Sequence, residues 1–376
     1  MGRSIHVATI QMNGAPAPRA KRLAQAETSI AEAVAQGAQL VVLPASFNMG
    51  KSFDETRYER TERLSDPTTQ WLQQQARTHG MYIAGAYLVI DQADTYQRAL
   101  LTAPDGQTWH YDQQYPHLWD RAFYRDGQKI TVADTDLGKI GMLIGWDCAH
   151  PDLWERYASK IDLMLTFHDE PDYSQAQLRD GAEVIELSRQ ARRLGMTSAQ
   201  YTRAEIMQQS AWLQVPVVSA GLSGQFESIL PAPFFSVYAV LWSKPTMWQQ
   251  ANSGYAQMQL CAPFQAHTHI SDSVGQTIAS VTETNEAIIS ATLTLPDHTP
   301  LPDSPQPPSL TMESTRLTID LLSSALLRLT YQRGVRRQWG ARMAPLDRQT
   351  RIWRKVLLVS VLLALIIGRA VSAHQR

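Results

Sequence analysis

The sequence predicts an α/β domain followed by a proline-rich linker and a basic, helical tail. Over residues 5–295, short β-branched apolar runs alternate with segments of helical spacing. Residues 296–309 then contain six prolines, and the sign of the charge changes beyond them. The chain has 376 residues, of which 44% are apolar and 18% charged, as in an ordinary globular protein. One large domain with appended segments is therefore expected.

The domain opens with a predicted β-α-β unit, in which strands at 5–12 and 39–44 flank a helix at 22–36. The elements expected after it are a helix at 71–78, strands at 81–90, 97–104, 140–146 and 161–167, a short helix at 151–158, a helix-favouring stretch at 173–213, the run VPVVSAG at 215–221, and closing strands near 276–283 and 287–295.

Composition divides the chain into four parts: a domain at 1–296, a linker at 297–311, an amphipathic and basic helical segment at 312–355, and an apolar segment at 356–373. In the third part, Leu317, Leu321 and Leu329 share one broad helix face with neighbouring apolar residues. From Glu313 onward there are 12 Lys/Arg against 3 Asp/Glu, which leaves 22 basic and 32 acidic residues upstream. A basic tail on an acidic body indicates that the tail has a partner of its own.

The apolar run VLLVSVLLALIIG at 356–368 is the candidate membrane anchor. Thirteen helical residues rise about 20 Å, but snorkelling of Arg369 extends the segment through Ala373 to a length that can span a bilayer. We expect a membrane anchor at 356–373, with the main domain cytoplasmic because arginines precede the anchor. The alternatives are a helix docked on the domain or on a partner subunit, and nucleic-acid binding by the arginines; no nucleic-acid partner is expected.

The two cysteines, Cys148 and Cys261, cannot form a disulfide framework, and no spacing of Cys and His indicates a zinc site. His168-Asp-Glu170 and His267-Thr-His269 are the suggestive clusters, but neither has a clear third ligand. We therefore expect neither a metal nor a cofactor. The N-terminus has no apolar segment typical of a signal peptide.

Three segments in order, HVATIQMNG at 6–14, GAQLVVLPASF at 37–47 and LGKIGMLIGWDCAHPDLWERYA at 137–158, resemble the carbon-nitrogen hydrolase (nitrilase) superfamily. The later segments VPVVSAGLSG and GQTIASVTETNEAIISATLTL resemble its closing strands. The resemblance implies a nitrilase-type four-layer α-β-β-α sandwich and a homodimer or higher homo-oligomer.

The family's hydrolysis uses a cysteine nucleophile, a glutamate that takes the thiol proton, and a lysine that stabilises negative charge. The resemblance places these roles at Gly145, Ala45 and Tyr115, of which the last is aligned on His117-Leu118. A slip of one or two residues would replace Tyr115 by Gln114 or Gln113, and no lysine occurs between Lys51 and Lys129. None of these residues can perform its assigned role, so the catalytic triad is expected to be lost.

A residual pocket is expected around His117, Asp120, Trp146, Asp147 and Cys148. Asp120 either keeps an acidic group near the site, pairs with Arg121 or Arg125, or caps the turn at Asp126-Gly127. Asp147 is expected to bind backbone donors. Cys148 is either a relocated nucleophile, with His150 or Asp147 as its base, or a small buried residue beneath the turn.

The sequence thus predicts a membrane-tethered pseudoenzyme that acts as a scaffold or as a sensor of a small amide or carboxylate metabolite. One alternative is an active amidase or nitrilase that uses Cys148. Another is a structural subunit of a membrane complex, which predicts exposed apolar patches on the 173–213 and 312–355 segments.

Overall fold

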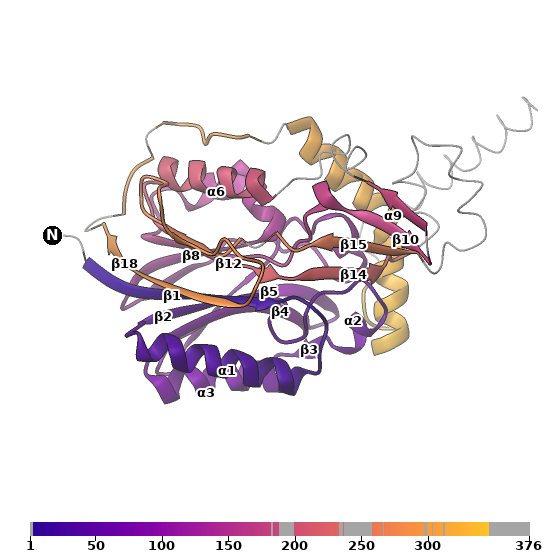
Figure 1. Cartoon of the computed structure of the whole chain (residues 1–376), viewed down its shortest axis with the longest axis horizontal. Coiled ribbons are helices and arrows are strands. Elements are labelled where there is room, and N and C mark those ends of the chain that lie inside the picture. The colour runs from indigo at the N-terminus through magenta and orange to yellow at the C-terminus, as the bar shows by residue number, and fades with distance from the viewer. Residues whose placement is uncertain are drawn as a thin grey trace, which may run out of the picture.

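The computed structural model describes residues 3–181, 183–187, 199–232, 236, 258–265, 267–296, 299–302, 304–310 and 313–345. Two β-sheets pack face to face, with helices covering both outer surfaces (Figure 1). The helices α1 (Arg19–Ala35) and α3 (Pro67–His79) cover one sheet, and α4 (Pro151–Tyr157) and α6 (Ala199–Leu213) cover the other. This is the four-layer α-β-β-α arrangement that the sequence predicts.

The first sheet is built on long central strands. Its order is β13 (Leu222–Ser223), β1 (Arg3–Asn13), β2 (Leu40–Ala45), β4 (Tyr82–Asp91), β5 (Asp94–Thr102) and β6 (Thr108–Asp112), with β18 (Ala287–Leu295) also paired to β1 and β3 (Glu62–Arg63) to β4. The second sheet has the order β17 (Thr277–Ser280), β16 (His269–Ser271), β12 (Val217–Ala220), β9 (Leu163–Phe167), β8 (Gly138–Ile144) and β7 (Val132–Thr135).

The strands β2, β8 and β9 are buried along their whole length apart from Lys139, which explains their nearly continuous apolar sequences. Side chains such as Val42, Leu143 and Val217 form the core between the sheets. Each buried aliphatic side chain of this size contributes about 1.5–3 kcal/mol. β8 and β9 are parallel neighbours, with Ile144 opposite Phe167, so the residues that follow both strands emerge at the same edge.

The expectation of helix over the whole of 173–213 is wrong for its first part. A 3-10 turn, η3 (Tyr173–Gln175), is followed by strands β10 (Gln177–Asp180) and β11 (Glu183–Glu186). These strands belong to a third sheet with the order β11, β10, β15 (Gln259–Pro263) and β14 (Gln225–Ile229). Asp180 pairs with Glu183, so the two-residue loop of this hairpin begins at Gly181, which adopts a positive φ of 56°.

The predicted tail helix is present as α9 (Glu313–Trp339), which lies along one end of the domain (Figure 1). It buries Ile319, Leu327, Tyr331 and Val335, whose spacing defines a single helix face. Leu317 is 50% exposed and Leu321 is 47% exposed, so these two members of the predicted leucine-rich face are not part of the buried surface. The docking partner decides which face is buried: α9 packs on the 3-10 turn η1 (Leu118–Ala122) and on α2 (Thr56–Glu59).

The described part of the predicted linker lies against α6. Trp212 Nε1 donates to the carbonyl of Ser304 at 3.0 Å, and the backbone N–H of Leu310 donates to Glu205 Oε2 at 3.0 Å. The predicted anchor at 356–373 lies outside the described residues. Within the part of the chain that the structure describes, no helix combines the length and apolar character needed to cross a membrane.

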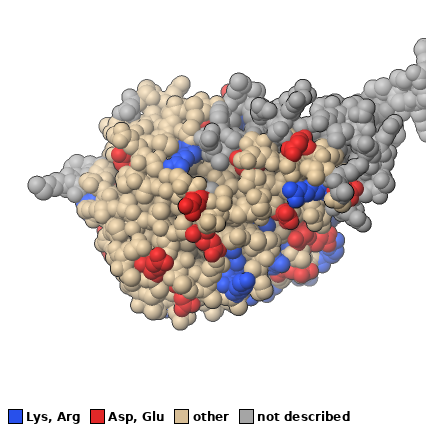
Figure 2. All heavy atoms as spheres, viewed as in Figure 1, with Lys and Arg blue, Asp and Glu red and all other residues tan. Residues whose placement is uncertain are grey.

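On the face drawn in Figure 2, acidic and basic side chains are interspersed, without a large area of one sign. The excess of acidic residues in the body of the protein is therefore not gathered into a single acidic surface on this face.

Candidate functional site

The end of β2 carries Ala45, at the position that the resemblance assigns to the glutamate. Ala45 is fully buried in the core between the sheets. The next residue, Ser46, has a positive φ of 56°, and its hydroxyl donates to Asp169 Oδ2 at 2.5 Å. The polar group offered at the end of β2 is thus a hydroxyl one residue later than the expected carboxylate.

Gly145 follows β8 and begins the 3-10 turn η2 (Gly145–Ala149), with a positive φ of 52°. A Cβ atom at this position would lie 1.8 Å from Glu170 Oε1. Real Cβ atoms essentially never approach another atom so closely, so the Glu170 carboxylate occupies the space in which a cysteine side chain at position 145 would begin. Glu170 comes from the residues after β9, at the same edge of the sheet.

Tyr115 and Gln113 lie on different sides of this turn. The Tyr115 ring stacks on His150, with the ring centres 3.6 Å apart, and its hydroxyl donates to Asp152 Oδ2 at 3.1 Å. Gln113 Nε2 instead donates to the carbonyl of Ile144 at 2.9 Å and lies 3.3 Å from the Cβ position of Gly145. Gln113, which the alignment reaches by a slip of two residues, is therefore the side chain that lies beside Gly145.

Asp120 is the centre of a buried ionic cluster. Its Oδ1 accepts hydrogen bonds from Lys51 Nζ at 2.7 Å and from Arg57 Nη1 at 2.8 Å. Lys51 Nζ also donates to Asp169 Oδ1 at 2.9 Å, and its side chain has no exposed surface. Burial alone would raise the pKa of Asp120, but Lys51 and Arg57 outweigh burial and lower it.

The alternative partners proposed for Asp120 are engaged elsewhere, so that interpretation is wrong. Arg121 Nη1 pairs with Asp126 at 2.7 Å, and Arg125 Nε pairs with Asp94 at 2.7 Å. The acidic group stays inside the protein because two buried cations stabilise its charge.

Lys51 reaches the cluster because of the turn that follows β2. Gly50 has a positive φ of 75°, and a Cβ there would lie 2.5 Å from the carbonyl oxygen of Ala15. Only glycine fits this close approach, which directs the chain inward at the next residue. Lys51 was not among the predicted site residues, although a lysine between the aromatic residues of FNMGKSF was a signal.

Asp169 and Glu170 were also missed as site residues, since HDE at 168–170 was interpreted as a weak metal cluster. Their position in the sequence could have indicated the site, because polar residues that follow a buried strand lie at the edge where the neighbouring parallel strand also ends. His168 Nδ1 lies 3.4 Å from Glu170 Oε2. Among the described residues, no group of three His, Cys, Asp or Glu side chains is arranged to hold a metal ion.

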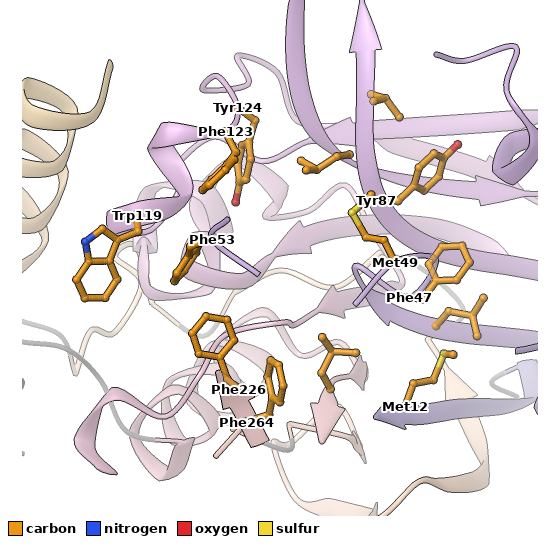
Figure 3. Close-up of a cluster of buried hydrophobic side chains, with 14 of the residues drawn as sticks. Met12, Phe47, Met49, Phe53, Tyr87, Trp119, Phe123, Tyr124, Phe226 and Phe264 are labelled. Carbon is orange, nitrogen blue, oxygen red and sulfur yellow. The ribbon is translucent and has the colours of Figure 1, made fainter. Parts of the chain in front are cut away.

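Aromatic side chains surround the ionic cluster. The Phe53 ring lies among Phe226, Trp119 and Phe123, with ring centres 5.1, 5.9 and 6.2 Å away (Figure 3). The Arg57 guanidinium lies 4.8 Å from the centre of the Phe123 ring. These aromatics pack on one another and on the cations, and so fill the interior beside the site.

Asp147 is completely buried and acts as an acceptor for its surroundings. It accepts hydrogen bonds from the Tyr111 hydroxyl at 2.7 Å and from the backbone N–H groups of Tyr115 at 2.7 Å and Gln114 at 3.1 Å. Burial raises the pKa of Asp147 to about 7, even though these hydrogen bonds act in the opposite direction. The predicted role in binding backbone donors is confirmed.

Cys148 is fully buried and belongs to the apolar core between the sheets. Burial, followed by the nearby charge of Asp147, raises the pKa of the Cys148 thiol well above its usual value. The neighbouring Trp154 Nε1 donates to the backbone carbonyl of Cys148 at 3.0 Å, which fixes the turn around it. These surroundings oppose formation of a thiolate.

Trp146 lies beneath the tail helix. Its Nε1 donates to Asp320 Oδ1 at 3.3 Å, and His150 Nε2 lies 3.0 Å from Asp320 Oδ2. Ile319 of α9 packs on Trp146 and Ala149. The chain's own tail therefore covers the turn that follows Gly145.

His117 is buried between the rings of Trp146 and Tyr173, and neither of its ring nitrogens has a hydrogen-bond partner. Burial lowers the pKa of His117 to about 4.

Burial also lowers the pKa of His269 to about 3 and that of His267 well below its usual value. Between pH 6.5 and 4 the unfolded chain thus binds protons that the native state does not, and the free energy of unfolding falls as the pH falls. Asp147, whose pKa is raised, has the opposite effect on the free energy of unfolding between pH 7 and 4. The three histidines together outweigh this single carboxyl group.

His117→Phe is expected to flatten this acid sensitivity. Phenylalanine keeps the ring contacts but cannot be protonated, so roughly 3 kcal/mol of stability that the wild type loses by pH 4 should be retained. Urea unfolding at pH 8, 6 and 4.5 measures the change, with partly exposed His79→Phe as the control. A wild-type slope retained in His117→Phe would contradict the assignment.

Comparison with known proteins identifies the family of this chain. Residues 6–303 match the family profile described as carbon-nitrogen hydrolase. The chain is 32% identical over 152 residues to a nitrilase from Pyrococcus abyssi, which covers 39% of this chain and 58% of that protein. It is 29% identical over 163 residues to an omega-amidase from Danio rerio, and this match covers 40% of this chain and 57% of that protein. The matches thus span less than two thirds of these relatives.

Solved structures share the fold. A carbon-nitrogen hydrolase superfamily protein from Xanthomonas campestris superposes with a TM-score of 0.56 at 16% identity, over 78% of this chain and 91% of that one. Nit3 from Saccharomyces cerevisiae superposes with a TM-score of 0.55 at 20% identity, over 78% of this chain and 90% of that one. With the profile covering most of its length, this chain belongs to the carbon-nitrogen hydrolase family, the nitrilase superfamily.

Proposed function

We propose that this protein is a membrane-tethered member of the carbon-nitrogen hydrolase family that acts by binding and does not hydrolyse C–N bonds. The observation that carries the proposal is the Glu170 carboxylate, which lies 1.8 Å from the Cβ position of Gly145. The space for the nucleophile is filled by a charged side chain of the same protein. Ala45 and Gln113, where a proton acceptor and a cation would be needed, supply neither.

The lysine function is assigned here to the position of Gln113. This assignment replaces Tyr115, because the Gln113 amide lies beside Gly145 while Tyr115 contacts Asp152. Lys51, the buried cation near this site, donates to two carboxylates at once. Its charge is compensated, which makes it a poor candidate for stabilising a reaction intermediate.

The alternative of an active hydrolase that uses Cys148 has less support. A nucleophilic thiol needs access to substrate and a lowered pKa, whereas Cys148 is fully buried and its pKa is raised. His150, the proposed base, contacts Tyr115 and Asp320.

Purified full-length protein is expected to release no ammonia from nitriles or ω-amides, the substrate classes named for its relatives. Without a nucleophile at position 145, no covalent intermediate can form there. A coupled ammonia assay checks this, with an active omega-amidase as the positive control. Turnover that disappears in Cys148→Ala would support the rearranged-site alternative instead.

The membrane tether is proposed from residues 356–373. The double substitution Leu362→Arg and Leu363→Arg is expected to move the protein from the membrane fraction to the supernatant, because each arginine at the centre of a span costs about 2.5–3.5 kcal/mol. Fractionation and immunoblotting of wild type and variant measure this shift, with Leu301→Arg and Leu310→Arg in the linker as the matched control. A wild-type protein found only in the supernatant would refute the tether.

Both binding roles have support. Leu317 and Leu321 of α9 are about half exposed, which favours a scaffold that docks a protein partner. A polar cavity beside α9 favours a sensor. A homodimer or higher homo-oligomer remains a proposal that native mass measurement would test.

A further inference from the structure

We propose that the N-terminal half of α9, residues 313–326, is a lid that opens over the site around Gly145 and is hinged on the C-terminal half of the same helix. With α9 docked, Gly145 and its neighbours Gln113 and Glu170 are all buried. A small metabolite can therefore reach this site only if an element that covers it moves. The inference rests on the proposed sensor role, but the opening itself is measured without a ligand.

Asp320 is the polar anchor of the lid. Its Oδ1 accepts hydrogen bonds from Trp146 Nε1 at 3.3 Å and from Arg121 Nη2 at 3.4 Å. Its Oδ2 lies 3.0 Å from His150 Nε2. Trp146 and His150 lie in and directly after the turn η2, which begins at Gly145, so the lid is attached to the site's own turn. Burial alone would raise the pKa of Asp320, but its contacts with His150 and Arg121 lower it, and docking thus stabilises the carboxylate's charge.

The two halves of α9 differ in how much apolar surface they bury. Of the lid's described side chains, Ile319 is buried, whereas Leu317 and Leu321 are about half exposed. The C-terminal half buries three large apolar side chains, those of Leu327, Tyr331 and Val335. Segments with few buried apolar contacts open locally at a lower free-energy cost. The lid is therefore the half of α9 that detaches more easily.

The C-terminal half of α9 has the contacts expected of a hinge. A Cβ atom at Gly334 would lie 2.1 Å from Tyr58 Cζ, so the helix lies directly against α2 there. Trp339 Nε1 donates to the carbonyl of Tyr58 at 3.0 Å, and the Tyr331 hydroxyl donates to Asp94 Oδ1 at 2.8 Å. These contacts hold the C-terminal half in place when the lid moves.

The closed position leaves buried polar groups unpaired beside the lid. His117 directly precedes η1, on which α9 packs, and its ring centre lies 4.6 Å from that of Trp146. Among the described residues, neither ring nitrogen of His117 has a hydrogen-bond partner, and the hydroxyl of neighbouring Tyr173 has none either. Buried groups without partners are unfavourable, and water that enters when the lid opens would satisfy them. Hydration of these groups therefore lowers the free-energy cost of opening.

The linker that precedes the lid permits the movement. Its hydrogen bonds with α6 use backbone groups of Ser304, Pro308 and Leu310. Within 299–302 and 304–310, the part of the linker that the structure describes, no side chain is buried. Displacing the linker together with the lid thus exposes little additional apolar surface.

Hydrogen exchange of the full-length protein, followed by mass spectrometry, tests the lid. In the wild type, amides of 313–326 should exchange roughly tenfold faster than those of 327–339, after correction for intrinsic rates. Ile319→Ala should accelerate exchange in the lid and in η2 by roughly another tenfold and leave α1 unchanged. Leu321→Ala is the matched control, because it removes an aliphatic side chain from the exposed side of the same helical turn and should exchange as the wild type does.

Modification of His150 by diethyl pyrocarbonate gives a second readout that reports exposure of the turn beneath the lid. Ile319 packs on Trp146 and Ala149, so Ile319→Ala leaves the pair of His150 with Asp320 chemically intact. We expect modification to be roughly tenfold faster in Ile319→Ala than in Leu321→Ala or the wild type.

Two results would overturn the inference. Equal acceleration of exchange throughout the protein, α1 included, would show that Ile319→Ala weakens the whole fold and does not release a lid. Faster exchange in 313–326 with no change in η2 or in His150 modification would show that the helix end frays without uncovering the site. Ammonia release is measured independently, so a fixed α9 is distinguishable from failure of the proposed non-catalytic role.

Discussion

Gly145→Ala is expected to lower the free energy of unfolding by about 1–3 kcal/mol, although it adds only one methyl group. The methyl carbon would lie 1.8 Å from Glu170 Oε1, so the carboxylate must move within a buried site. The positive φ of 52° adds the cost of a left-handed backbone for a residue with a Cβ. Urea unfolding monitored by tryptophan fluorescence measures the loss.

Two controls separate these causes. Gly80→Ala has a similar φ of 63° and nothing within 4 Å of its Cβ position, so it measures the backbone cost alone. The double variant Gly145→Ala, Glu170→Ala should recover the steric part of the loss. Equal losses for Gly145→Ala and Gly80→Ala would mean that Glu170 does not fill the nucleophile's space.

Lys51→Met is expected to destabilise the protein by about 3–5 kcal/mol, because it leaves buried carboxylates without their shared cation. Asp169 would keep only the Ser46 hydroxyl as a side-chain donor, whereas Asp120 would keep Arg57. Chemical unfolding at pH 7 measures the loss, and Lys129→Met, at an exposed lysine, should change stability little.

A second substitution tests whether charge is the cause. Asp169→Asn removes the carboxylate that loses most in Lys51→Met, so the double variant should be more stable than the sum of the single effects predicts. Strict additivity would show that the loss comes from side-chain packing and not from an unpaired charge.

The polar groups around Gly145 and Asp120 are engaged by other residues of the chain. Where the family would have a nucleophile, Glu170 fills the space beside Gly145, and Gln113 bonds the carbonyl of Ile144 at the end of the same strand. The nearby cations Lys51 and Arg57 are paired with Asp120. These ion pairs and hydrogen bonds stabilise the charges of the cluster, whereas the ring nitrogens of His117 nearby have no hydrogen-bond partner.

The sequence alone determined the layered α/β fold, because strands such as β2, β8 and β9 are buried and therefore nearly continuously apolar. The placing of the glutamate and cysteine positions at Ala45 and Gly145 follows from the family resemblance of the flanking segments and stays a prediction. At the β10–β11 hairpin, the helix-favouring composition of the segment predicts the wrong element.

Only the tertiary structure decided which distant residues meet. Lys51, Asp120 and Asp169 are separated by more than 45 residues from one another, and their pairing depends on three loops arriving at one place. The same holds for Glu170 beside Gly145 and for the buried face of α9, whose exposed leucines are as apolar as its buried ones. The periodicity of apolar residues predicts which side chains can be buried. The surface against which the helix packs determines which of them are buried.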